Sequence, residues 1–168
     1  IIDDSEGNPA EFWPVRQILE AGYATAAFHN SDVDPDMDDG FLNGVHGIFD
    51  SNKVNRSDDA WGSLAAWAWG ASRVIDYFET DPDLKGVKIA LVGHSRGGKT
   101  ALWCGAQDRR IDLTISNDSG NSGAALARAC TGETIAMITK NFPHWFAKNY
   151  FQYSNNEAAL PVDQHMLL

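Results

Sequence analysis

Apolar and polar residues recur along this chain with different spacings, and each change of spacing predicts a new helix or strand. Between residues 58 and 80 the apolar positions follow the period of a helix, whereas residues 87–92 are apolar except for Lys88 and predict a buried strand. Residues 99–107 predict a helix and residues 112–117 a second strand, and the chain from Ser122 onward predicts short helices and loops. This order predicts an α/β fold with a parallel sheet and right-handed crossovers.

The part of the chain before residue 58 has weaker patterns. Residues 14–20 predict a short helix, and Tyr23 to Phe28 predict a strand of alternating and buried character. A polar loop from His29 to about Arg56 follows, and its length is typical of a functional loop rather than a simple connection. Asp58 or Asp59 is expected to cap the long helix that comes next.

One octapeptide between the strand at 87–92 and the helix at 99–107 matches two catalytic motifs. Residues 93–100, Gly-His-Ser-Arg-Gly-Gly-Lys-Thr, contain G-x-S-x-G, the nucleophile elbow of α/β-hydrolases. They also satisfy G-x-x-x-x-G-K-[ST], the phosphate-binding P-loop. As an elbow, the glycines allow a tight turn that exposes the hydroxyl of Ser95, with backbone N–H groups free to hold an oxyanion.

The P-loop interpretation needs a magnesium-binding acid at the end of a neighbouring apolar strand. Asp118 follows the strand at 112–117, but Thr114 and Ser116 interrupt its apolar run. The residues therefore favour the hydrolase interpretation and leave a nucleotide-binding protein as the alternative of another class.

Composition and charge narrow the range of functions. The chain has 168 residues, of which 43% are hydrophobic, enough for one packed domain. The net charge of -10 argues against a nucleic-acid partner, which would require a basic face. No apolar run approaches the roughly 20 residues of a membrane span, and no signal peptide is visible.

The cysteines and tryptophans add little about function. Cys104 and Cys130 do not make a disulfide framework, and we expect Cys104 to be a buried free thiol. Six tryptophans indicate either core packing or a cleft for sugar or aryl groups.

The longer sequence around the octapeptide resembles the glucuronoyl esterases, carbohydrate esterase family 15, and in particular their bacterial branch. The resemblance covers most of residues 23–168, and the segments that carry it are Gly-His-Ser-Arg-Gly-Gly-Lys (93–99), Arg-Ile-Asp-Leu-Thr-Ile (110–115), Asn-Asp-Ser-Gly-Asn-Ser-Gly-Ala-Ala (117–125), Trp-Phe (145–146) and Leu-Pro-Val-Asp-Gln-His (160–165). The Ser-Arg-x-Gly-Lys core with its downstream acid-Ser-Gly is more specific than either short motif. On this basis the P-loop match is interpreted as a coincidence.

The resemblance implies a role for five residues. Ser95 would be the nucleophile, Arg96 would help to hold the oxyanion, and Lys99 would contact sugar hydroxyls. Asp118 occupies the place of the acid of the catalytic triad, where the family usually has Glu, and it is shorter by one methylene. Glu133 matches an acidic residue that contacts the sugar. The resemblance implies no metal and no cofactor.

The histidine of the triad is not among these residues. After Asp118 only His144 and His165 remain, and in the family both lie in scaffold segments, with the catalytic histidine further on. Trp145 likewise does not match the substrate-contacting tryptophan of the family. His29, His46 and His94 precede the nucleophile and are expected to be structural or loop residues. We therefore expect residues 1–168 to form a single partial α/β-hydrolase-like domain, with a mostly parallel sheet and flanking helices, incomplete at both ends.

The segment from Asp32 to Gly40 is dense in carboxylates. An EF-hand loop needs Gly at its sixth position, where this segment has Met37, so calcium is the weaker alternative and a solvated loop near the cleft is expected.

The function implied by the resemblance is hydrolysis of esters of glucuronic acid, as in the links between xylan side chains and lignin alcohols. The implied partner is a small-molecule or polysaccharide substrate, and the implied location is secreted or periplasmic. Another carbohydrate or aryl ester, such as an acetyl xylan, and a non-catalytic fragment remain as alternatives.

Overall fold

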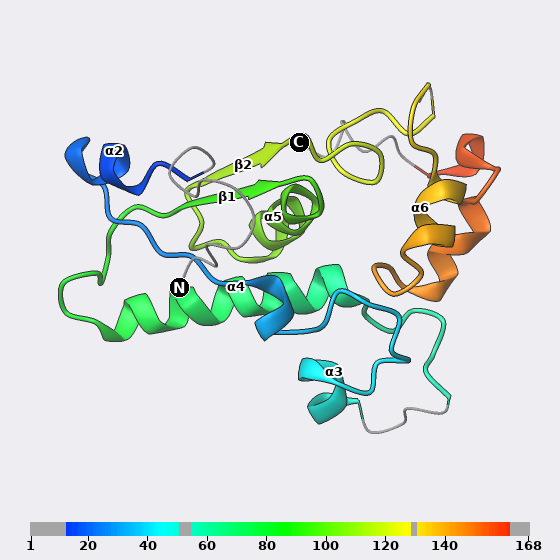
Figure 1. Cartoon of the computed structure of the whole chain (residues 1–168), viewed down its shortest axis with the longest axis horizontal. Coiled ribbons are helices and arrows are strands. Elements are labelled where there is room, and N and C mark those ends of the chain that lie inside the picture. The colour runs from blue at the N-terminus through cyan, green and yellow to red at the C-terminus, as the bar shows by residue number, and fades with distance from the viewer. Residues whose placement is uncertain (1–12, 51–54, 129–130, 162–168) are drawn as a thin grey trace.

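The helices and strands of the chain follow one another in the α/β order that the sequence predicts (Figure 1). The computed structural model describes residues 13–50, 55–128 and 131–161. The elements in chain order are α2 (Val15–Glu20), η1 (Asn30–Asp32), α3 (Gly44–Phe49), α4 (Ser63–Thr80), β1 (Ala90–His94), α5 (Arg96–Gln107), β2 (Leu113–Asn117), α6 (Ile135–Asn141), η2 (Lys148–Tyr153) and η3 (Glu157–Ala159).

β1 and β2 form a parallel pair, and α5 is the crossover between them. The register runs from Ala90 opposite Leu113 to His94 opposite Asn117, so both strands end at the same edge of the sheet. α5 lies very close to β2, because a Cβ atom on Gly105 would be 2.1 Å from the hydroxyl oxygen of Thr114. α4 packs in turn on α5, through a core of Ala68, Ala71 and Cys104. The predicted parallel sheet with flanking helices is confirmed.

The face of the sheet turned away from α5 is more open than the sequence predicts. Leu113 is 55% exposed and Ile115 42%. β1 also begins at Ala90 rather than at residue 87. The strand predicted from Tyr23 to Phe28 is wrong: those residues belong to no helix or strand and are mostly exposed, because no described strand pairs with them.

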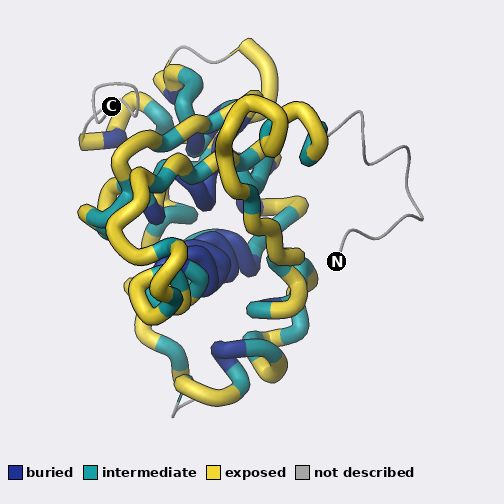
Figure 2. The backbone as a smooth tube through the Cα atoms, turned by 90° about the vertical axis from the view of Figure 1, so that its left-hand side faces the viewer, coloured by how far each residue is buried: buried dark blue, intermediate teal, exposed yellow. Residues whose placement is uncertain are grey.

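α4 is the central helix of the molecule, and its buried turns are visible end-on in the middle of Figure 2. It begins at Ser63 rather than at the predicted Asp58 or Asp59. The reason is a cap from a distant part of the chain: the backbone N–H of Ser63 donates to the carbonyl oxygen of His144 at 2.9 Å, and that of Leu64 donates to Trp145 at 3.3 Å. These contacts satisfy helix N–H groups that an aspartate would otherwise cap.

The polar segment that begins at His29 is not a simple loop, and its acidic part from Asp32 to Gly40 is not solvated throughout, although its composition predicts that. It contains η1 and α3, and Asp34 is only 3% exposed. The carboxylate of Asp34 contacts the Nδ1 atom of His46 at 2.7 Å and accepts a hydrogen bond from the hydroxyl of Ser63 at 2.7 Å. The segment is thereby fixed to the start of α4, and His46 has the structural role expected of it.

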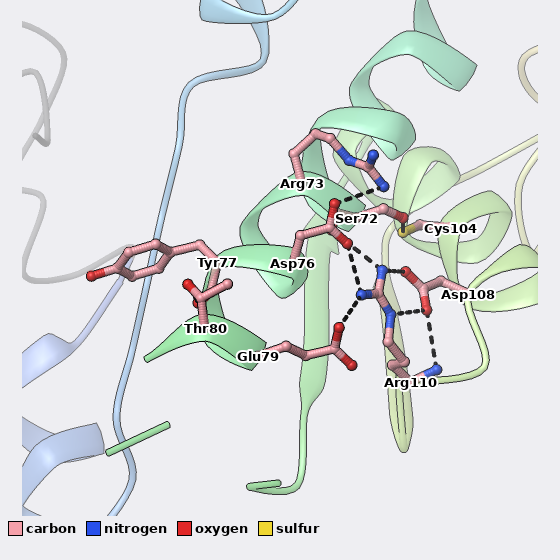
Figure 3. Close-up of polar contacts among 9 residues, drawn as sticks. All are labelled: Ser72, Arg73, Asp76, Tyr77, Glu79, Thr80, Cys104, Asp108 and Arg110. Carbon is pink, nitrogen blue, oxygen red and sulfur yellow. Dashed lines mark hydrogen bonds and ion pairs between the residues drawn. The ribbon is translucent and has the colours of Figure 1, made fainter. Parts of the chain in front are cut away.

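Arg110, in the turn before β2, connects that turn with α4 (Figure 3). Its guanidinium donates to the carboxylates of Asp108 at 2.6 Å, Asp76 at 2.7 Å and Glu79 at 3.1 Å, and these hydrogen bonds raise the pKa of Arg110. Cys104 is a buried free thiol, as predicted, and burial raises its pKa. Cys130 lies outside the described residues.

None of the helices in the described ranges has the length and apolar character needed to cross a membrane.

Candidate active site

Ser95 lies at the turn between the end of β1 and the start of α5. Its φ angle is 53°, a region that residues other than glycine rarely adopt and that often marks functional sites. The backbone N–H of Ser95 donates to the carbonyl oxygen of Asn117 at 2.9 Å, so the turn is held against the end of β2. Its hydroxyl makes no capping bond to the described backbone of α5. This is the strand–turn–helix geometry that a nucleophile elbow requires.

The space around the turn is set by two glycines in the first turn of α5. A Cβ atom on Gly98 would lie 2.9 Å from the Cβ of Ser119, whereas a Cβ on Gly97 would meet no heavy atom within 4 Å. Gly98 therefore allows the helix to pack closely on the segment after β2. Gly97 lies on the open side of the turn.

Arg96 is the first residue of α5, and its guanidinium is held by contacts from two distant segments. It pairs with the carboxylate of Asp36, and its central carbon lies 5.4 Å from the ring centre of Phe142 and 5.1 Å from that of Trp145. The side chain of Arg96 is nevertheless 42% exposed. A cation fixed next to Ser95, the candidate nucleophile, and still open to solvent is suited to stabilise a negative charge that develops on a substrate.

Asp36 is a residue of the site that sequence reasoning missed. The carboxylate also contacts the Nε1 atom of Trp145 at 2.8 Å and the Nε2 atom of His144 at 3.0 Å. Burial by itself would raise the pKa of Asp36, but the hydrogen bonds from His144, Trp145 and Arg96 and the charge of Arg96 lower it to about 2. The only signal in the sequence was the density of carboxylates from Asp32 to Gly40, which does not show which of them is buried.

Asp118 follows the end of β2, as Ser95 follows the end of β1. Because His94 and Asn117 are opposite one another in the parallel register, the two candidate catalytic residues come next to each other at one edge of the sheet. Asp118 has a φ angle of 47° and an exposed side chain. This placement is the one that the sequence predicts for the acid of a triad.

Lys99 and Glu133, the two candidate sugar-binding residues, lie near one another beside the segment after β2. A Cβ atom on Gly120 would be 3.8 Å from the Nζ atom of Lys99 and 3.7 Å from a carboxylate oxygen of Glu133. Lys99 is only 6% exposed, and its ammonium donates to the carbonyl oxygen of Ser119. Burial lowers the pKa of Lys99, and the negative charges of Glu133 and Asp118 oppose that effect.

No histidine of the described ranges is hydrogen-bonded to the hydroxyl of Ser95. His144 is 5% exposed, and its Nε2 atom contacts Asp36. A ring nitrogen of His94 contacts the side-chain amide of Asn117 at 2.9 Å. His165 lies outside the described residues. The burial of His144 agrees with a scaffold role, and so does the burial of Trp145, which is 4% exposed in the core.

Among residues 13–50, 55–128 and 131–161 no group of three or more His, Cys, Asp or Glu side chains could hold a metal ion. In the acidic segment after η1, the carboxylates of Asp34 and Asp36 instead accept hydrogen bonds from Ser63 and Trp145.

A cavity of about 450 Å³ lies between α4 and α5, and tryptophans 61, 69 and 103 are among its lining residues, whereas Ser95 is not. Five of the six tryptophans are thus divided between the core, with Trp67 and Trp145, and this separate cavity, while the indole N–H of Trp13 donates to the hydroxyl of Thr25 at 3.0 Å.

Comparison with known proteins gives consistent results over nearly the whole chain. Residues 11–168 match the family described as glucuronyl esterase, fungi. A carbohydrate esterase from an unknown prokaryotic organism is 45% identical over 165 residues, which are 98% of this chain and 38% of that protein. The solved structure of a glucuronoyl esterase from Solibacter usitatus is 42% identical with a TM-score of 0.89, and the match covers 99% of this chain and 43% of that one.

A more distant solved structure includes a bound sugar ester. It is a variant of the glucuronoyl esterase from Sporotrichum thermophile in complex with methyl 4-O-methyl-beta-D-glucopyranuronate, at 32% identity and a TM-score of 0.68, and the match covers 83% of this chain and 40% of that one. The chain described here spans about two fifths of the length of each of these three proteins.

Proposed function

Since this chain belongs to the glucuronoyl esterases, carbohydrate esterase family 15, we propose that the protein carrying it is a serine esterase that hydrolyses esters of glucuronic acid. The natural substrates in this proposal are the ester links between xylan side chains and lignin alcohols. The observation that carries the proposal is the position of Ser95 at a strained turn, directly before the fixed guanidinium of Arg96 and beside Asp118. We further propose that residues 1–168 are part of one α/β-hydrolase domain and that the protein acts outside the cytoplasm.

In the proposed reaction the hydroxyl oxygen of Ser95 attacks the ester carbonyl carbon, and the π electrons of the carbonyl move to its oxygen. Backbone N–H groups of the elbow and the guanidinium of Arg96 stabilise that oxyanion. In this proposal the proton of Ser95 passes to a histidine base that lies after Leu168, and Asp118 orients this base. When the oxyanion collapses, the alcohol leaves with that proton. Water then attacks the glucuronoyl ester of Ser95 in the same manner and releases the free acid.

Lys99 and Glu133 would bind the sugar part of the substrate. An ammonium and a carboxylate in the same region offer both a donor and an acceptor to neighbouring sugar hydroxyls. The burial of Lys99 supports this role, because a hydrogen bond to a charged and partly desolvated donor is stronger than one in water.

The P-loop interpretation is not supported. The chain belongs to a family of esterases. In a P-loop the ammonium of Lys99 would have to bind phosphate, but here it donates to the carbonyl oxygen of Ser119.

The test is an assay of the full-length protein on the methyl ester of 4-O-methyl-glucuronic acid, with Ser95→Ala as the comparison. We expect turnover in the wild type and a loss of several powers of ten in the variant, because the nucleophile is removed. A fluorophosphonate label should react with the wild type and not with the variant. An active Ser95→Ala variant, or tight magnesium-dependent ATP binding by the wild type, would refute the proposal.

A further inference from the structure

The guanidinium of Arg96 is held by residues from two parts of the chain that are far from it and from each other in sequence. Asp36 comes from the segment after η1, and Phe142 and Trp145 come from the turn after α6. The ring planes of Phe142 and Trp145 are stacked, with centres 3.9 Å apart and an angle of 4° between them. The guanidinium lies near both rings and pairs with Asp36.

Asp36 is held in place by residues other than Arg96. One carboxylate oxygen, Oδ1, contacts the Nε1 atom of Trp145 at 2.8 Å and the Nε2 atom of His144 at 3.0 Å. The other oxygen, Oδ2, accepts the hydrogen bond from the Nη1 atom of Arg96. The two oxygens therefore have separate roles: Oδ1 is bound to the scaffold and Oδ2 is presented to the arginine.

An arginine side chain that is not held would sample many rotamers, and its charge would be averaged over them. Oxyanion stabilisation depends instead on donors that are already in place when the charge develops. The guanidinium has five N–H donors, and its side chain is 42% exposed, so the pairing with Asp36 leaves donors for a substrate.

On this geometry, and resting on the proposed function, we infer that Asp36 is a positioning residue for the reaction: it fixes the Arg96 guanidinium beside Ser95, and it acts only through Arg96. It does not contact the substrate in this inference. His144 and Trp145 contribute indirectly, because their contacts hold the carboxylate of Asp36 in place.

The experiment is a double-mutant cycle in the full-length protein, assayed on the methyl ester of 4-O-methyl-glucuronic acid. Asp36→Asn keeps the size of the side chain and removes its charge. In the wild-type background we expect kcat to fall about tenfold, less than the hundredfold that loss of an oxyanion donor costs, with KM nearly unchanged. In the Arg96→Ala background the same substitution should have no further effect on kcat. The matched control is Asp38→Asn, on an exposed aspartate of the same segment, which should behave as wild type.

An unchanged kcat in Asp36→Asn would overturn the inference. An equal fall of kcat in both backgrounds would also overturn it, because Asp36 would then support the fold rather than Arg96. If Asp36→Asn does not fold, Trp145→Phe is used in the same cycle, since it keeps a ring and removes the N–H group that fixes Asp36. Its effect on kcat should likewise depend on Arg96, and an effect independent of Arg96 refutes the inference. A wild-type protein that is inactive on this ester would refute the proposed function instead.

Discussion

The main chain of Gly93 lies directly against that of Gly97. A Cβ atom on Gly93 would be 1.9 Å from the carbonyl oxygen of Gly97 and 2.8 Å from the backbone nitrogen of Gly98. β1 can therefore turn into α5 at Ser95 only if position 93 has no side chain. The glycines of the motif are thus not equivalent, because Gly97 itself faces open space.

This difference gives a matched pair of stability predictions. Gly93→Ala should lower the free energy of unfolding by about 3 kcal/mol, the upper end of ordinary overpacking, because the obstructing atoms belong to the backbone. Gly97→Ala should raise it by up to about 1 kcal/mol, because alanine favours the helix and meets no atom there. Urea denaturation of both variants measures the two effects. Equal stability of the two variants would contradict the prediction.

Asp34 should be among the most important polar residues for the fold. Asp34→Ala removes the buried carboxylate that serves both His46 and Ser63, and those groups would remain buried without an acceptor. We expect the free energy of unfolding to fall by about 3 kcal/mol. Asp32→Ala, on an exposed aspartate two residues earlier, is the control and should change stability by less than about 0.5 kcal/mol. A thermal or urea unfolding curve of Asp34→Ala that matches the wild type would refute this prediction.

Lys99 should affect substrate choice more than chemistry. Lys99→Met keeps the length of the side chain and removes the charge, so KM for glucuronate esters should rise about tenfold, as expected for loss of a charged hydrogen bond. Simple acetyl esters should be hydrolysed at nearly the wild-type rate. Lys140→Met, on an exposed lysine of α6, is the control. Equal losses on both kinds of ester would show that Lys99 does not recognise the sugar.

Asp36 should make stability depend on pH in acid. Its pKa is about 2 in the folded protein and near 3.8 in the unfolded chain, so the unfolded chain takes up the proton first as pH falls. The stabilisation is fully present above about pH 3.8 and is lost as pH falls through about 2. The charged and titratable groups that face Asp36 are Arg96 and His144. Urea midpoints measured from pH 5 to 2 should show the difference between wild type and Asp36→Asn shrinking over that window. A constant difference would contradict this assignment.

The elements around Ser95 were predictable from the sequence because they are determined by neighbouring residues. The turn, α5 and β2 depend on local spacing and on the glycines near Ser95, and the parallel pairing follows from the crossover. The placement of Asp118 beside Ser95 follows from the same rule, since both residues come directly after paired strands.

The remaining features depend on contacts between distant residues, which local patterns do not encode. The start of α4 is determined by the carbonyl groups of His144 and Trp145 rather than by an aspartate before the helix. The acidic segment after η1 has the composition of a solvated loop, yet Asp34 and Asp36 are bound to partners from other segments. Residues 23–28 have the composition of a strand, but no described strand pairs with them.

The contacts that hold the guanidinium of Arg96 also have a consequence for the time course of folding. Asp36 is 60 residues from Arg96, and it is 108 and 109 residues from His144 and Trp145, whereas the turn at Ser95 is made by adjacent residues. Closing such long segments of chain costs more entropy than forming a local turn, and contacts of this kind slow folding. We therefore expect the turn at Ser95 to form early and the arginine to be fixed late. A partly folded molecule would then have its serine in place without the cation beside it.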